Sequence, residues 1–123
     1  MTLCAVTLDC ADPVALAGFY ERATGLAPVA GSGEDFAGLR GSAGFFLGFQ
    51  RVPGYRPPRW PGQEDPQQSH LDFEVDDLDS AEVALLKLGA GKPDEQPNQE
   101  RWRVLLDPAG HPFCLTESKT VRK

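Results

Sequence analysis

The residues best suited to chemistry in this 123-residue chain are an imidazole and a carboxylate near two predicted strands. His70 opens a segment in which polar and apolar residues alternate, so it faces away from Leu71 and Phe73. Glu117 ends a second alternating segment. If both side chains converge in a cleft, they could hold a divalent metal ion, with the Gln50 amide oxygen as a third ligand. Alternatively, His70 is a hydrogen-bonded cleft histidine and Glu117 is a solvated strand end.

An internal repeat supplies the strands that would position these residues. At an offset of 65, residues 5–12 align with residues 70–77, and both segments alternate as half-buried strands do. Asp9, Asp72 and Glu74 fall on the polar faces. Such a carboxylate cluster could raise a pKa for base catalysis, although solvation at a strand edge is the simpler interpretation.

The repeat continues into one amphipathic helix in each half, with apolar residues at positions i, i+3, i+4 and i+7. Asp12 before a proline predicts the start of the first helix, and Asp79 with Glu82 three residues later predicts the start of the second. Gly25 and Gly89 predict the two helix ends, because the residue after a helix often needs a positive φ.

The repeat returns near the end of each half, where residues 45–50 align with residues 112–117 at an offset of 67. Residues 107–110 predict a turn into the last strand, and His111 is assigned to the geometry of that turn. Each half is thus predicted to be a βαβββ module. The predicted parts are module one at residues 1–52, a proline-rich linker at residues 53–68 and module two at residues 69–123.

Each module is too small to bury a core alone, since about 50 residues with one helix leave too much surface exposed. We therefore predict a single α+β domain over residues 1–123, in which two tandem βαβββ modules form a curved, incomplete eight-stranded barrel. The helices would cover its convex side, and the other face would be a cleft. The predicted lining of this ligand pocket is Phe46, Gly48, Asp72, Phe113, Leu115 and Trp102.

The amino-acid composition limits the classes of molecule that the protein is expected to bind. The net charge of −6 repels nucleic acid and anionic membranes alike, so neither is an expected partner. The longest apolar run is far too short to span a bilayer, and the first residues do not form a signal peptide, so we expect a cytoplasmic protein. The three cysteines, Cys4, Cys10 and Cys114, form no paired motif and are expected to be reduced.

Three segments together resemble the vicinal oxygen chelate superfamily, and within it the glyoxalase-like and bleomycin-resistance-like members. They are residues 12–25, residues 70–89 and residues 107–113. The resemblance implies the same incomplete barrel. In metal-dependent members the ligands lie at the start of the first strand and the end of the last strand of each module. Carried over to this chain, those positions are Ala5, Gln50, His70 and Glu117.

Two functions follow from this resemblance. As a metal-dependent lyase or isomerase, the chain would hold Zn, Ni, Mn or Fe with His70, Glu117 and Gln50, and act on a substrate with vicinal oxygens. Glu117 would then be catalytic, carrying a proton. Ala5 offers no ligand atom, however, and the alternative is a metal-free protein that sequesters a small ligand. A third possibility is a regulatory module with a vestigial cleft. The resemblance also predicts a homodimer.

Overall fold

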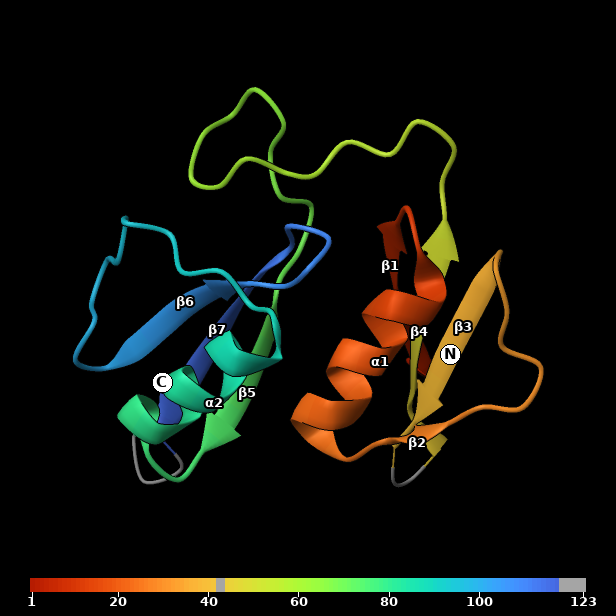
Figure 1. The fold of residues 1–123 in the computed structure, drawn as a ribbon, viewed down its shortest axis with the longest axis horizontal. Helices are drawn as coiled ribbons and strands as arrows, with labels where there is room; N and C mark the ends of the chain where they lie inside the picture. Colours follow the sequence, from red (N-terminus) through yellow and green to blue (C-terminus); the bar gives the residue numbers. More distant parts are fainter. Residues whose placement is uncertain (42–43, 118–123) are drawn as a thin grey trace. The chain divides into compact units, whose positions relative to one another are not determined.

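The computed structural model describes residues 1–41 and 44–117, which divide between Arg56 and Pro57 into two compact units. Each unit contains one sheet and one helix (Figure 1). The first unit contains β1 (Ala5–Cys10), α1 (Pro13–Thr24), β2 (Ala27–Pro28), β3 (Phe36–Arg40) and β4 (Phe46–Arg51). The second contains β5 (Leu71–Val75), α2 (Leu78–Leu88), β6 (Trp102–Leu106) and β7 (Pro112–Glu117).

The first unit confirms the predicted βαβββ order. Its strands lie in the order β1-β4-β3-β2, and β1 runs parallel to β4. Helix α1 begins where expected, because the Asp12 carboxylate accepts a hydrogen bond of 3.1 Å from the Ala15 backbone N–H. It ends at Gly25, whose φ of 78° is in the left-handed region that favours glycine.

The core of the first unit lies between α1 and one face of its sheet. Leu8 and Phe49 are register partners on β1 and β4, and both are buried. The Tyr20 ring of α1 stacks on Phe49 with 5.6 Å between the ring centroids. Residues with the parity of Phe49 therefore face α1, and residues one step along each strand face away from it.

The second unit has the order β5-β7-β6, with β5 parallel to β7. Helix α2 begins at Leu78 with its cap at Asp77, two residues before the predicted cap Asp79, because the Asp77 carboxylate accepts a bond of 2.8 Å from the Ser80 N–H. The fourth strand expected in this module is reduced, among the described residues, to a single antiparallel bridge between Gly91 and Leu106.

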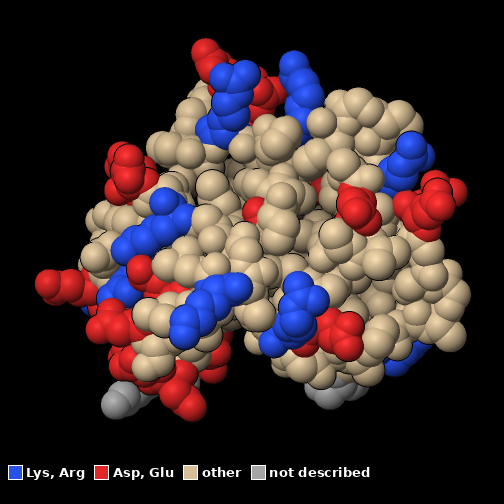
Figure 2. Space-filling model, viewed as in Figure 1, with Lys and Arg blue, Asp and Glu red and all other residues tan. Residues whose placement is uncertain are grey.

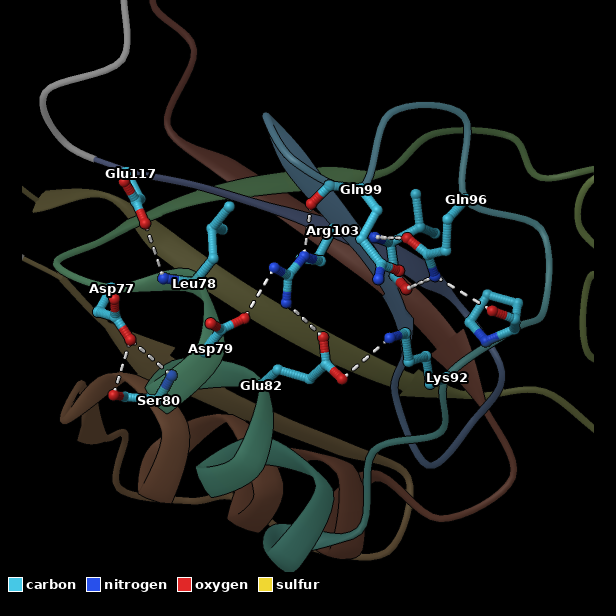
Figure 3. A network of polar contacts seen from close by, with 12 residues as sticks. Asp77, Leu78, Asp79, Ser80, Glu82, Lys92, Gln96, Gln99, Arg103 and Glu117 are labelled. Carbon is cyan, nitrogen blue, oxygen red and sulfur yellow. Dashed lines mark hydrogen bonds and ion pairs between the residues drawn. The ribbon is translucent and has the colours of Figure 1, made fainter.

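A glutamine side chain makes hydrogen bonds to β6 that the fourth strand would otherwise make. The Gln96 Oε1 accepts from the Val104 backbone N–H at 3.0 Å, and its Nε2 donates to the Val104 carbonyl at 2.8 Å (Figure 3). The primary amide thus pairs with β6 as a neighbouring peptide group would. Because Val104 is buried, these two backbone groups would otherwise lack a partner.

Replacing this amide is expected to destabilise the second unit. Gln96→Ala should lower the free energy of unfolding by about 1–3 kcal/mol, since a buried N–H and a buried C=O lose their partners. Urea unfolding followed by tryptophan fluorescence measures the change, because Trp60 and Trp102 both lie in this unit. Gln63→Ala, at an exposed glutamine, should leave the unfolding midpoint unchanged. Equal losses in the two variants would contradict the role of Gln96.

An ion-pair network joins α2 to β6. The Arg103 guanidinium donates at 2.8 Å to both Asp79 and Glu82 on the helix, and Lys92 lies 3.0 Å from the second Glu82 oxygen (Figure 3). Burial raises the pKa of Glu82, but the hydrogen bonds and charges of Lys92 and Arg103 outweigh it, so the net pKa is below the ordinary value.

This lowered pKa predicts an acid-sensitive contribution to stability. A carboxyl whose pKa is lower in the folded state stabilises the fold above its ordinary pKa of 4.5 and loses that effect as the pH falls through the folded value. We expect Glu82→Gln to flatten the loss of stability below pH 4.5, measured by urea unfolding at several pH values. Glu64→Gln, whose carboxylate pairs with Arg59 on the surface, should keep the slope of the unchanged chain.

Acidic side chains gather on the surface around α2 in the second unit (Figure 2). Their excess agrees with the net charge of −6. Within the described residues, neither helix has the length and apolar character needed to cross a bilayer.

Candidate functional site

The register of β1 and β4 decides which side chains of the first unit face away from α1. Ala5 pairs with Phe46, Thr7 with Gly48 and Asp9 with Gln50. Register partners on parallel strands project on the same side of a sheet. Three of the residues predicted from the sequence, Phe46, Gly48 and Gln50, therefore lie together on the side of the sheet away from α1.

Two stacked phenyl rings dominate this face. The Phe36 and Phe46 rings are parallel within 1°, with centroids 5.9 Å apart. Each ring covers a glycine of the neighbouring strand: a Cβ atom at Gly48 would lie 2.8 Å from the Phe36 ring, and one at Gly38 would collide with the Phe46 ring. Phe36 remains 39% exposed. We call Phe36, Phe46, Gly38 and Gly48 the aromatic ledge.

The prediction from sequence found only half of this ledge, because it did not consider the strand that carries Phe36 and Gly38. A signal for it is present in the sequence. A Phe-X-Gly triplet occurs at residues 36–38 and again at residues 46–48, and β3 and β4 are antiparallel partners that set Gly38 opposite Gly48. Each phenylalanine is then diagonal to the other strand's glycine, a position in which an aromatic ring covers the bare backbone.

In the second unit, the strand register places two predicted pocket residues, Phe113 and Leu115, on the core face of the sheet. Phe113 pairs with Leu71, Leu115 pairs with Phe73, and Phe113 makes an edge-to-face contact with Phe73. Phe113 and Leu115 are both almost fully buried. These two residues were expected in the ligand pocket, but they belong to the core face of the sheet, which α2 covers.

Glu117 follows the same parity and also faces α2. It pairs with Val75 at the end of β7, and its Oε2 accepts a bond of 3.1 Å from the Leu78 backbone N–H at the start of α2 (Figure 3). This carboxylate satisfies a free helix N–H and complements the positive end of the helix dipole. His70 and Asp72 project on the opposite face. The structure therefore does not bring His70 and Glu117 together as the sequence analysis expected.

A one-residue shift explains the difference. Leu47 pairs with Val6 in the first unit, and Phe113 pairs with Leu71 in the second, so the last strands correspond at an offset of 66 rather than 67. A shift of one residue moves every side chain of a strand to the other face. The counterpart of Gln50 is therefore Thr116, which offers a hydroxyl in place of a carboxylate.

The face away from α2 brings together His70, Asp72 and Cys114, and Trp102 has the same parity on β6. The His70 Nε2 lies 3.5 Å from Asp72 Oδ1. Burial, followed by the charge of Asp72 and a hydrogen bond to it, raises the pKa of the Cys114 thiol to about 11. The thiol is thus protonated at neutral pH. From the sequence, Cys114 was expected only to be reduced.

The four positions that the resemblance assigns to a metal do not fit one. Ala5 carries no ligand atom, and Glu117 is bonded to the start of α2. His70 and Gln50 remain, and they belong to different units. A metal site of high affinity needs three or four ligand atoms. His111, the other histidine, lies in the turn held by Asp107, whose Oδ1 accepts its backbone N–H at 3.0 Å.

Comparison with known proteins gives the same fold. The model of the glyoxalase-like domain family matches residues 5–116. A possible glyoxalase from Bacillus cereus has a TM-score of 0.69 with 22% identity, covering 94% of this chain and 98% of that one. A glyoxalase/bleomycin resistance protein/dioxygenase family enzyme from Burkholderia phytofirmans PsJN has a TM-score of 0.71 with 22% identity, covering 95% and 98%.

A lactoylglutathione lyase from Agrobacterium tumefaciens is similar as well, with a TM-score of 0.63 and 18% identity over 96% of this chain and 94% of that one. At such identities the likeness shows the fold alone. No protein of curated function matches the chain significantly.

Proposed function

The chain belongs to the glyoxalase-like domain family, and we propose that it binds a small, flat, aromatic ligand on its aromatic ledge without the help of a metal. The resemblance to the vicinal oxygen chelate superfamily and its α+β fold is thereby confirmed. The observation that supports the proposal is the stacked Phe36–Phe46 ring pair lying over two glycines, with the Phe36 ring exposed.

Physical reasons make the ledge suitable for stacking. The glycines let both rings lie close to the backbone, where they are held by the sheet. A ring in a fixed position loses little conformational entropy when a ligand stacks on it. Offset stacking of aromatic rings contributes about 0.5–1.5 kcal/mol beyond the area buried. Phe36 offers its exposed surface for such a contact.

Polar groups beside the rings indicate which ligand would fit. Arg40 is the register partner of Phe46, and Gln50 is the register partner of Phe36. Asp9 is opposite Gln50 on β1. A guanidinium at one end attracts an anionic group, and an amide with a carboxylate at the other end accepts hydrogen-bond donors. We therefore propose a flat aromatic acid with polar substituents as the ligand class.

The hypothesis that this chain is a metal-dependent lyase or isomerase has weaker support. It requires His70, Gln50 and Glu117 to converge as the three protein ligands of one metal ion. Ala5 lacks a donor, and Glu117 is engaged at the start of α2. Sequestration of a ligand needs neither residue, and it agrees with a binding face built from rings, a guanidinium and an amide.

Binding of naphthoate, a flat aromatic carboxylate, tests the proposal. We expect naphthoate to raise the melting temperature, because a ligand that binds only the folded state stabilises it. The shift should be the same with and without a chelator. Phe36→Leu keeps an apolar side chain but removes the ring, and it should weaken binding about tenfold. Isothermal titration gives the affinity.

Phe45→Leu is the matched control, because Phe45 is 38% exposed and lies outside the ledge. It should bind naphthoate as the unchanged chain does. Loss of binding on chelation, or equal loss in the two leucine variants, would overturn the proposal.

Two further predictions, the homodimer and the cytoplasmic location, can be measured directly. A homodimer, predicted from the resemblance, would give twice the chain mass of 13.3 kDa in sedimentation equilibrium. Location in the cytoplasm, predicted from the sequence, is tested by fractionating cells that produce the chain.

A further inference from the structure

Three side chains with different metal-binding atoms meet in the second unit. An imidazole nitrogen of His70, a carboxylate oxygen of Asp72 and the sulfur of Cys114 all lie within 4.8 Å of one another. Neither the aromatic ledge nor the Arg103 network includes any of them. His70 and Asp72 are exposed and Cys114 is half-buried, so an ion in solution can reach the cluster.

The sheet itself fixes the cluster. Asp72 on β5 and Cys114 on β7 are direct register partners on parallel strands, so their side chains emerge side by side. His70 precedes Asp72 by two residues, which returns it to the same face. Two of the three atoms are thus positioned by backbone hydrogen bonds of the sheet.

We propose that His70, Asp72 and Cys114 form a binding site for a thiophilic divalent cation such as Zn²⁺. One nitrogen, one oxygen and one sulfur ligand are the set that Zn²⁺ accepts, with a fourth position left to water or a ligand. A thiolate selects Zn²⁺ and Co²⁺ over Mg²⁺ and Ca²⁺, which prefer oxygen alone. On coordination the S–H bond is replaced by an S–metal bond, and the proton leaves to solvent.

The geometry requires a modest adjustment. Ligand atoms at the corners of a tetrahedron around Zn²⁺ are about 3.5 Å apart, given bonds of about 2.0–2.3 Å. The separations in the cluster reach up to 4.8 Å. Rotation of the two exposed side chains, His70 and Asp72, can close this difference without moving the strands.

This site goes beyond the proposed function and differs from the ligand set that the resemblance implies. It keeps His70 but takes Asp72 and Cys114, which are not among the four positions carried over. It also lies wholly in the second unit, whereas the aromatic ledge lies wholly in the first.

Titration of the full, untagged, reduced chain with Co²⁺ tests the site. A thiolate ligand gives an intense charge-transfer absorption that nitrogen and oxygen ligands do not give, so we expect this band to saturate at one Co²⁺ per chain, and Zn²⁺ to abolish it by displacement. Cys114→Ser should remove the band. Its affinity for Zn²⁺ should fall by more than the roughly 10- to 100-fold lost when only an outer partner of a ligand is removed.

Matched variants distinguish the cluster from adventitious binding. Cys4→Ser, at an exposed thiol, and His111→Asn, at the other histidine, should leave the band and the affinity unchanged. His70→Asn and Asp72→Asn, both at exposed positions, should weaken binding while the band persists at high Co²⁺. Absence of the band in the unchanged chain, its survival in Cys114→Ser, or its loss in Cys4→Ser would overturn the site.

The two proposals can fail separately. Phe36→Leu should retain the full Co²⁺ band, because the ledge contributes no ligand atom. Cys114→Ser should bind naphthoate as the unchanged chain does.

Discussion

Arg103→Met is expected to lower the free energy of unfolding by about 3 kcal/mol, because it removes the cation from a largely buried pair. The Arg103 side chain is 12% exposed and Glu82 is 15% exposed. Methionine retains most of the apolar stem, so the loss reports on the charge and its hydrogen bonds. We place the effect at the lower end for buried pairs, since Lys92 still contacts Glu82 and Asp79 can turn to solvent.

Arg59→Met provides the control for this prediction. Arg59 also pairs with two carboxylates, those of Glu64 and Asp65, but its side chain is 66% exposed. An exposed ion pair contributes about 0–1 kcal/mol, so the loss should be correspondingly small. Both arginines lie in the second unit, and tryptophan fluorescence during urea unfolding measures both variants. Similar losses in Arg59→Met and Arg103→Met would contradict the structural role of burial.

Gly38→Val is expected to weaken naphthoate binding by more than about tenfold, because it destroys both halves of the stacked pair. A Cβ at Gly38 collides with the Phe46 ring, and that ring packs in turn against Phe36. The Phe46 ring must leave its place over the strand. Valine is favoured in strands, so intrinsic propensity alone predicts a gain in stability. Overpacking predicts a loss of about 1–3 kcal/mol.

Strand propensity and overpacking predict opposite changes in the stability of Gly38→Val, so the experiment distinguishes between them. Isothermal titration should show weaker naphthoate binding by Gly38→Val, and thermal unfolding should show that the variant is less stable. Gly33→Ala is the control, because its added Cβ meets nothing within 4 Å and its φ is not in the left-handed region. It should bind and melt as the unchanged chain does. Full binding by Gly38→Val would contradict the role of the ledge.

Local signals in the sequence predicted the elements that depend on a few neighbouring residues. Asp12 and Gly25 bound the first helix as expected, because a cap and a left-handed residue act within one turn. The turn at residues 107–110 is also confirmed, with a bond of 2.8 Å from the Gly110 N–H to the Asp107 carbonyl. The start of α2 was missed by two residues because Asp77 and Asp79 are both suitable caps, and the sequence does not rank them.

The candidate site depended on strand register, which local signals do not determine. Alternation correctly grouped Phe113, Leu115 and Glu117 on one face. It could not say whether that face meets the helix or points away from it. The repeat, with an offset of 67, suggested that this face points away from the helix. The hydrogen bonds between β5 and β7 instead give an offset of 66 between the last strands of the two units. One residue therefore separated a predicted metal ligand, Glu117, from its observed place at the start of α2.

The Gln96 amide has a consequence for how copies of this protein behave when crowded. A sheet margin with bare N–H and C=O groups can recruit the extended segment of another molecule and grow into an aggregate. By occupying both groups of Val104, Gln96 closes that margin where, among the described residues, the expected fourth strand is reduced to a single bridge. We therefore expect this one side chain to protect the shortened sheet against such growth.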